Sequence, residues 1–293
     1  MRILLTGGNG FIGSYLKPRL LDAGHDVCHP TEAQMDLRNL NHVETIVKDF
    51  DPQIVIHLAA KTEVAFSFDD YEDVSNVNYI GTVRLAEAVR KYATDFQLFL
   101  MASTMETYGH HVTDVPFTEA TPQYPAAPYA VAKVAAEKYL AYMRYAYELP
   151  SVILRQTNTY GRTRNDFFVM ERIVTQMLRG KTINLGAPDP VRNFLWIEDL
   201  IDLYMEILDQ RPIGQTFVTG PANGLTIKEL VDLIAERLDW KGEVNWHTMP
   251  ARPGEIWYLN SNPAKAKEML GWEPKVSLEE GIDRTIALWE RKS

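Results

Sequence analysis

A glycine-rich segment near the start of the chain limits the possible folds more than any other feature. The apolar run Arg2–Thr6 leads directly into TGGNGFIG, and Phe11–Ala23 then has the spacing of an amphipathic helix. A strand, a tight glycine turn and a helix in this order are typical of a dinucleotide-binding βα unit. Gly7 permits the turn, Gly10 lets the backbone approach a pyrophosphate, and Gly13 lets helix and strand pack closely. We therefore expect a dinucleotide to contact Gly7, Gly10, Phe11, Ile12 and Gly13.

The rest of the first half alternates between strand-like and helix-like segments. The expected strands are Arg2–Thr6, Asp26–His29, Ile54–Leu58, Gln97–Ser103 and Ser151–Gln156, and the helices between them are Phe11–Ala23, Leu40–Phe50, Val74–Tyr92 and Ala126–Glu148. This alternation predicts an α/β fold, a Rossmann-type doubly wound parallel sheet, followed by a smaller, mostly helical C-terminal lobe. We expect a dinucleotide-binding domain over 1–160, to which a segment at about 190–215 returns, and a substrate lobe over 161–293.

Composition excludes several other classes of protein. The 293 residues carry a formal charge of −9, which argues against binding to nucleic acid or to anionic membranes. No apolar run reaches the roughly 18 residues of a membrane span. The single cysteine, Cys28, excludes an internal disulfide and a cysteine-based metal cluster. We expect a cytoplasmic protein without a metal, a nucleic-acid partner or a membrane anchor.

The residues after the second strand bear on the choice of dinucleotide. An acidic residue there would accept hydrogen bonds from the ribose and repel a 2′-phosphate. Thr31 occupies that position and Glu32 follows it, and no arginine there could bind a 2′-phosphate. The cofactor is therefore left open between NAD and NADP. Asp36 is a candidate for binding the adenine amino group, and a turn or helix-cap role suits it equally well.

Tyr129 and Lys133 lie four residues apart in PYAVAKVAAEKYL and share one face of the expected helix. An ammonium close to a phenol lowers the phenol pKa from about 10 towards neutrality, so that a phenolate can take a proton from a substrate hydroxyl. The preceding strand ends in Ser103 and Thr104, whose hydroxyls could bind the reacting oxygen.

Together these segments resemble the extended short-chain dehydrogenases/reductases of the NAD(P)-dependent nucleotide-sugar epimerase/dehydratase family. The resemblance covers almost the whole chain. It includes HLAA at His57–Ala60, NVNYIGT around Asn78, LRQTNTYGR, VRNFLWIEDL, ARPGE and LGWEP. It implies an enzyme that binds NAD(P) and a nucleotide-diphosphate sugar, with further cofactor contacts from Leu37, Leu58, Ala59, Ala60, Tyr129 and Lys133.

The resemblance also implies roles for individual residues. Tyr129 would be the base in oxidation of the sugar at C4, Lys133 its pKa tuner and ribose anchor, and Thr104 the hydroxyl that holds the C4 oxygen. Substrate contacts are implied for Thr104, Met105, Glu106, Asn158, Arg192 and Arg252, with Glu255 near the nucleotide ribose. Several relatives dimerise through two long helices, and Tyr139, Tyr142 and Tyr145 would suit such a contact, so a homodimer is expected.

The run Thr104–Met105–Glu106 bears on the reaction. In dehydratases of the family a glutamate at this place removes the C5 proton, so Glu106 favours dehydratase-like chemistry. Met105 departs from their pattern, because a thioether cannot donate a proton to a leaving hydroxyl. A 4-epimerase and a 4-ketoreductase remain alternatives, and a non-catalytic dinucleotide sensor is an alternative of another class.

Overall fold

The computed structural model describes residues 1–111 and 113–291, and the chain divides into two compact units. The first unit comprises residues 1–109, 122–156 and 203–217. The second comprises residues 110–121, 157–202 and 218–293. A late segment, 203–217, thus belongs to the first unit, where the sequence analysis expected a return at about 190–215.

The first unit is built on a six-stranded sheet in the order β10-β5-β4-β3-β1-β2. Neighbours among β1 to β5 are parallel. All residues of β3 and β4 are buried, as expected for parallel strands covered by helices on both faces. The predicted Rossmann-type sheet is confirmed. Its strands are β1 (Arg2–Thr6), β2 (Asp26–Cys28), β3 (Ile54–His57), β4 (Leu98–Thr104), β5 (Ser151–Gln156) and β10 (Thr216–Val218).

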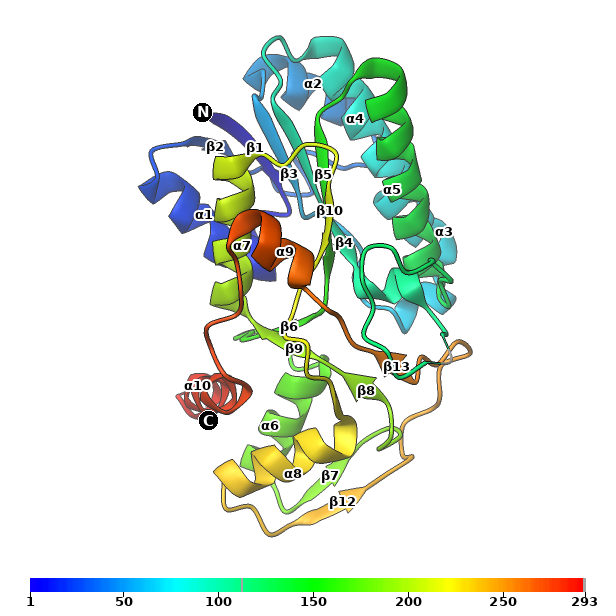
Figure 1. Cartoon of the computed structure of the whole chain (residues 1–293), viewed down its shortest axis with the longest axis vertical. Helices are drawn as coiled ribbons and strands as arrows, with labels where there is room; N and C mark the ends of the chain where they lie inside the picture. The colour runs from blue at the N-terminus through cyan, green and yellow to red at the C-terminus, as the bar shows by residue number, and fades with distance from the viewer. Residues whose placement is uncertain (112, 292–293) are drawn as a thin grey trace. The chain divides into compact units, whose positions relative to one another are not determined.

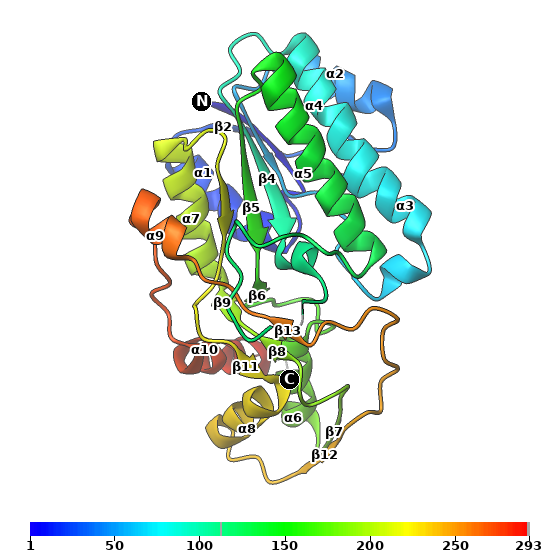
Figure 2. The same ribbon diagram turned by 45° about the vertical axis from the view of Figure 1, so that its right-hand side comes forward.

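Helices cover both faces of this sheet (Figure 1). On one face α2 (Leu40–Phe50), α4 (Gly81–Tyr92) and α5 (Pro128–Tyr147) lie side by side, and α1 (Phe11–Asp22) lies on the other (Figure 2). The helix expected over Val74–Tyr92 is a composite. It consists of α3 (Tyr71–Ser75), the π-helical turn η2 (Asn76–Ile80) and α4. Short 3₁₀ turns, η1 (Phe66–Phe68) and η3 (Met105–Tyr108), follow β3 and β4.

The strand order places a switch point at β1, because β2 lies on one side of it and β3 on the other. In sheets of this kind ligands bind in the crevice outside the carboxyl ends of the strands at such a point. The loops that leave β1, β3 and β4 begin at Gly7, Leu58 and Met105. These loops carry Gly7, Gly10, Leu58, Ala59, Ala60 and Glu106 among the predicted cofactor and reaction residues.

The second unit combines helices with short strands. Helices α6 (Val169–Arg179), α8 (Ile227–Arg237) and α10 (Leu278–Glu290) contact one another, and α9 (Ala264–Leu270) precedes α10. The strand pairs are β6 with β9, β7 with β12, and β8 with both β11 and β13. These strands of two or three residues were not predicted, because so few positions show no periodicity. Their bounds are β6 (Asn158–Tyr160), β7 (Thr182–Asn184), β8 (Val191–Arg192), β9 (Phe194–Trp196), β11 (Leu225–Thr226), β12 (Glu243–Asn245) and β13 (Tyr258–Leu259).

One helix, α7 (Ile197–Gln210), begins in the second unit and ends in the first. Among the helices that the structure describes, none combines the length and the apolar character needed to cross a membrane.

Candidate active site

The glycine turn after β1 has the shape that a dinucleotide pyrophosphate requires. Gly7 has a φ of +71°, and a Cβ there would lie 2.7 Å from the Ala59 nitrogen. A Cβ at Gly13 would overlap the Gly7 carbonyl oxygen, so helix α1 approaches the turn as closely as glycine allows. The Gly10 nitrogen donates to the Gly7 oxygen (2.9 Å), and no side chain caps the start of α1. The turn therefore presents a helix N-terminus without an acidic residue, which fits an anionic ligand.

A buried chain of hydrogen bonds stabilises the residues on which this turn packs. The Thr6 hydroxyl bonds to His57 Nδ1 (2.7 Å), and His57 Nε2 bonds to the Thr82 hydroxyl (3.0 Å). Thr82 donates its own proton to the Asn78 carbonyl (2.8 Å), so His57 must donate from Nε2 and accept at Nδ1. Burial, and secondarily the charge of Lys133, lower the pKa of His57 to about 3. The imidazole is therefore neutral, and Thr6 also accepts from the Ala59 nitrogen (3.2 Å).

The side chain of Asn78 fixes the loop that follows β3. Its Oδ1 accepts from the Lys61 nitrogen (2.8 Å) and its Nδ2 donates to the Lys61 oxygen (2.9 Å). Asn78 is fully buried and lies in the π-helical turn, a feature that is frequent at functional sites. The sequence analysis gave neither His57 nor Asn78 a role. The available signal was a polar residue at the end of an apolar strand and another inside a helix.

The residues after β2 form a compact turn. Thr31 is exposed, and its hydroxyl donates to Gln34 Oε1 (3.0 Å). Leu37 is buried, whereas Asp36 Oδ1 accepts from both the backbone nitrogen and the Nε of Arg38 (2.9 Å each). These hydrogen bonds lower the pKa of Asp36. Ribose binding by Thr31 and adenine binding by Asp36 stay predictions.

Arg38 stands among three carboxylates at this place. Its guanidinium bonds to Glu32 (2.7 Å), Asp36 (2.9 Å) and Asp73 (2.9 Å). Lys61 also pairs with Asp73 (3.1 Å). The sequence analysis noted no arginine directly after β2, and the fold brings Arg38 there from seven residues beyond Thr31. Its charge is already matched by the surrounding acids.

Thr104, Glu106 and Tyr129 meet at the carboxyl end of β4. The Thr104 side chain lies beside the Tyr129 phenol and acts to lower its pKa, and Thr104 Oγ1 accepts from the Glu106 nitrogen (3.1 Å). Burial, and then the negative charge of Glu106, raise the pKa of Tyr129. Glu106 Oε2 is a buried atom without a hydrogen-bond partner. A carboxylate oxygen, a phenol and a hydroxyl are thus brought together as the sequence analysis expected.

Lys133 is buried and donates from Nζ to the Ala102 carbonyl (2.9 Å). Burial lowers its pKa to about 8, and the charge of Glu137 opposes that shift. The expectation that Lys133 lowers the phenol pKa is wrong for this structure. The pKa of Tyr129 is raised, because the phenol is desolvated and faces a carboxylate while the ammonium is bound to the backbone.

The hydroxyl of Ser103 is directed elsewhere than the sequence suggested. The Ser103 hydroxyl donates to Glu137 Oε1 within the core, so this hydroxyl is not available to a reacting oxygen. Met105 has no exposed surface, and substrate contact through its side chain stays a prediction. Glu137 and Arg155, which the sequence analysis did not single out, form a buried ion pair beside Ser103 (2.7 Å).

The predicted substrate residues of the second unit form a charged cluster of their own. Glu255 Oε1 accepts from Arg252 Nη2 (2.8 Å) and lies 3.5 Å from Arg192 Nη2. Arg192 Nη2 also donates to the Ile256 carbonyl (2.8 Å). The two guanidinium groups help to lower the pKa of Glu255. Asn158 Nδ2 donates to the carbonyl of Asn193, the residue after Arg192 (3.3 Å), so all four predicted residues lie in this unit.

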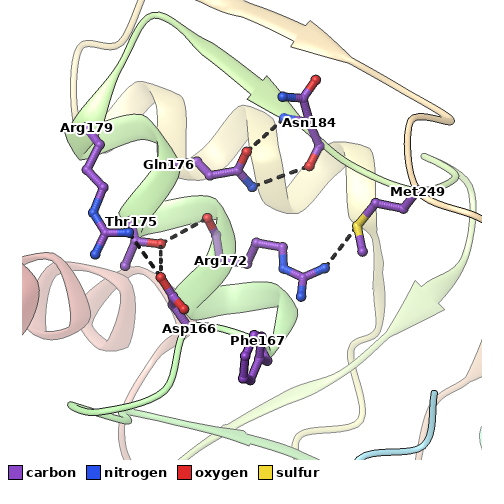
Figure 3. A pocket seen from close by; sticks show the side chains of 8 residues that line it. All are labelled: Asp166, Phe167, Arg172, Thr175, Gln176, Arg179, Asn184 and Met249. Carbon is purple, nitrogen blue, oxygen red and sulfur yellow. Dashed lines mark hydrogen bonds and ion pairs between the residues drawn. The ribbon is translucent and has the colours of Figure 1, made fainter. Parts of the chain in front are cut away.

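A cavity of about 320 Å³ also lies in the second unit, along α6 and β7 (Figure 3). The polar groups that line it are largely bonded to one another. Asp166 accepts from Arg179 (3.1 Å) and Thr175, and Gln176 bonds to Asn184 at both ends of its amide. None of the predicted site residues lines this cavity.

Comparison with known proteins agrees with this architecture. The model of the GDP-mannose 4,6 dehydratase family matches residues 29–285. The UDP-glucose 4-epimerase of Mycolicibacterium smegmatis is 32% identical over the full length of both chains. The dTDP-glucose 4,6-dehydratase of Haemophilus influenzae is 25% identical over 98% of this chain and 97% of its own. The crystal structure of the Thermus thermophilus UDP-glucose 4-epimerase in complex with NAD has a TM-score of 0.90, with 30% identity over 99% of each chain. The chain therefore belongs to the GDP-mannose 4,6 dehydratase family, extended short-chain dehydrogenases/reductases that include the nucleotide-sugar epimerases and dehydratases.

Proposed function

We propose that this protein is an NAD(P)-dependent enzyme that oxidises a nucleotide-diphosphate sugar at C4 and then removes the C5 proton through Glu106. The observation that carries the second step is the buried, unpartnered Oε2 of Glu106, whose carboxylate acts on the phenol of Tyr129 beside Thr104. A carboxylate oxygen without a donor can accept a proton from a substrate at little structural cost. The glycine turn and the kinship with an NAD-bound epimerase support the cofactor.

The side chains of the first unit divide the chemistry between them. Nicotinamide bound beside these residues would supply the hydride acceptor for C4. Tyr129 would take the proton of the C4 hydroxyl as a phenolate, a form that the positive charge of oxidised nicotinamide would favour against the burial that raises the phenol pKa. Thr104, which lies beside Tyr129, would hold the same oxygen. The resulting C4 ketone acidifies the C5 proton, which Glu106 would then remove. The electron pair left at C5 would expel the C6 hydroxyl as water, and return of the hydride to C6 and of a proton to C5 would give a product lighter by one water.

The second unit offers charges that suit the nucleotide diphosphate. Guanidinium groups bind phosphate oxygens through two parallel hydrogen bonds. Arg192 and Arg252 both lie against Glu255, which keeps their side chains in place. We propose that these arginines and Asn158 bind the diphosphate, with Glu255 near the nucleotide ribose.

The change Glu106→Gln tests the elimination step. We expect product formation to fall at least about 100-fold, because the C5 proton then has no base. Oxidation at C4 should continue, so reduced cofactor should appear transiently by absorbance. The assay uses UDP-, dTDP-, GDP- and CDP-sugars, with mass spectrometry for a product lighter by one water. Glu72→Gln, which removes an exposed carboxylate from α3, is the matched control. Unchanged turnover in Glu106→Gln would remove this residue from the mechanism.

A 4-epimerase is the second candidate, and two observations favour it. The two relatives with 30% identity or more named above are epimerases. Met105 also provides no proton donor for a departing hydroxyl. This function predicts a product of unchanged mass with inverted configuration at C4, and only a modest effect of Glu106→Gln.

We also propose a cytoplasmic homodimer that is formed through α4 and α5. Tyr145 is 91% exposed and Tyr142 is 47% exposed, both on α5. Tyr139 is less exposed, and its hydroxyl donates to Glu87 on α4 (2.7 Å), so it ties the two helices together. Aromatic side chains of this kind are enriched at protein interfaces. The cytoplasmic location rests on the sequence, in particular on its single cysteine.

A further inference from the structure

A buried asparagine joins the chain segments that carry two of the predicted diphosphate contacts. Asn193 lies between β8 and β9 in the second unit and has no exposed surface. Its Nδ2 donates to the Pro221 carbonyl (2.8 Å) and to the Ser261 hydroxyl. Its Oδ1 accepts from the hydroxyl of Thr157, which also lies 3.1 Å from the Asn193 carbonyl oxygen. The amide therefore uses both of its N–H groups and its oxygen inside the core.

Two further hydrogen bonds and a glycine close this network. Ser261 donates to the Thr219 carbonyl, and Thr219 Oγ1 accepts from the Thr157 nitrogen (2.9 Å). Gly220 has a φ of +106°, and a Cβ there would lie 2.8 Å from Asn193 Nδ2. The bonded residues are 28 to 68 positions apart in the chain. A fully bonded polar network inside the core favours a single arrangement, so it holds these distant segments in fixed positions.

The predicted diphosphate contacts are chain neighbours of this network. Asn158 follows Thr157 directly, and its Nδ2 donates to the Asn193 carbonyl (3.3 Å). Arg192 directly precedes Asn193, and its guanidinium donates from Nη2 to the Ile256 carbonyl (2.8 Å). The backbone on which both side chains stand is therefore fixed by the hydrogen bonds of Asn193.

The network acts on geometry and not on charge. None of its members is ionisable, since Asn193 is bonded to hydroxyl and carbonyl groups only. A guanidinium makes two parallel hydrogen bonds to phosphate only when its plane faces the phosphate oxygens. Groups that bind a ligand must be held to within about 0.5 Å of the productive geometry by the residues behind them. The amide of Asn193 meets this requirement for the two residues beside it.

We propose that Asn193 is a positioning residue for the diphosphate of the substrate: its amide, through the bonded network, holds Asn158 and Arg192 in the geometry that binds phosphate. The inference rests on the proposed function for the roles of Asn158 and Arg192. The side chain of Asn193 acts from within the core, where its polar atoms are bonded to the protein.

The test is calorimetric titration with UDP, dTDP, GDP and CDP, and separately with NAD. Asn193→Ala removes the hydrogen bonds of the amide, so we expect the Kd of the nucleoside diphosphate that binds most tightly to rise at least about tenfold. The Kd of NAD should change by less than about twofold, because the glycine turn lies in the first unit. Thr285→Val is the matched control. Thr285 on α10 is also fully buried, and loss of its hydrogen bond to the Gly281 carbonyl should leave both affinities unchanged.

Two changes at Thr157 separate positioning from packing. Thr157→Val keeps the shape but leaves Asn193 Oδ1 without its donor, whereas Thr157→Ser keeps the hydroxyl and loses a methyl group. Positioning predicts that Thr157→Val weakens nucleoside diphosphate binding by about fivefold or more, and that Thr157→Ser binds like the unchanged protein. A role in packing alone predicts the reverse order. These two changes also carry the test if Asn193→Ala does not fold.

Equal nucleoside diphosphate affinity in Asn193→Ala, Thr157→Val and the unchanged protein would overturn this inference and leave the proposed function intact. An equal loss of affinity for NAD would also overturn it, because a general loss of structure would then explain the result. An unchanged protein that binds none of the four nucleoside diphosphates would refute the proposed binding by Asn158 and Arg192, and this inference with it.

Discussion

Single polar residues inside the sheet hold the loops on which the proposed chemistry depends. His57 is fully buried at the end of β3, and its two nitrogens bond to Thr6 and Thr82. Its lowered pKa of about 3 has a consequence for the free energy of unfolding. The stabilisation from a neutral buried histidine is complete above the ordinary value of about 6.5 and is lost as the pH falls towards 3.

We therefore expect acid to destabilise the protein through His57. Between pH 7 and pH 5 the unchanged protein should lose about 2 kcal/mol more unfolding free energy than His57→Gln, which has no group to charge. Urea unfolding at the two pH values measures this difference. His110→Gln, which changes an exposed histidine, should behave like the unchanged protein. Parallel pH dependence in the His57→Gln variant and the unchanged protein would contradict the prediction.

The residues that could be predicted from the sequence are those that belong to short sequence patterns. Those whose partners lie far away in the chain could not be predicted. The glycine turn, the Tyr129–Lys133 spacing and the Thr104–Glu106 run are local patterns. The structure places the first and the last at the carboxyl ends of β1 and β4, and Tyr129 and Lys133 on α5. The partners of Glu137 lie 14 to 34 residues away in the chain, so no short pattern could indicate them. The hydrogen bond from Lys133 to Ala102 spans 31 residues, which is why the effect on Tyr129 was predicted wrongly.

At the scale of elements, the loop after β2 bears on the choice of cofactor. In this fold the adenosine ribose lies at the end of the second strand. There the three carboxylates Glu32, Asp36 and Asp73 face two cations, Arg38 and Lys61. The excess of negative charge would repel the additional phosphate of NADP, and no unmatched arginine compensates for it within this cluster.

We expect the protein to bind NAD at least about tenfold more tightly than NADP, a difference of about 1.4 kcal/mol. Calorimetric titration of the two cofactors gives the ratio. The combined change Glu32→Gln and Asp73→Asn removes two of the three carboxylates that pair with Arg38. It should therefore reduce the ratio of the NAD affinity to the NADP affinity. Glu44→Gln removes the acid of an exposed pair with Lys91 and should leave the ratio unchanged. Equal affinity for both cofactors in the unchanged protein would refute this account.

The long elements were predicted well and the short ones were not. The strands β1 and β5 have the predicted bounds, because each contains three consecutive apolar residues within a segment of strand length. The π-helical turn η2 breaks the helix expected over Val74–Tyr92, and nothing in its apolar spacing indicates the change. The two- and three-residue strands of the second unit depend on partners far along the chain, so that local propensity carries little information about them.

At the scale of the whole molecule, the proposed dimer gives a direct test. Introducing charge at the exposed face of α5, with Tyr142→Glu and Tyr145→Glu together, should yield a monomer by light scattering. The reason is that two like charges on each partner would have to lose their water in the interface. Met269→Glu places a charge at a similarly exposed position on α9 and should leave the mass unchanged. A monomeric mass for the unchanged protein would exclude the dimer.

The contribution of residues 203–217 to the first unit limits how the gene can be divided. Strand β10 borders β5 and is encoded more than 50 residues after it. A fragment truncated at residue 160 would leave the backbone groups of β5 open along one side, a template for aggregation. A self-sufficient nucleotide-binding module would have to combine distant stretches of the chain, because no single cut separates the first unit intact from the second.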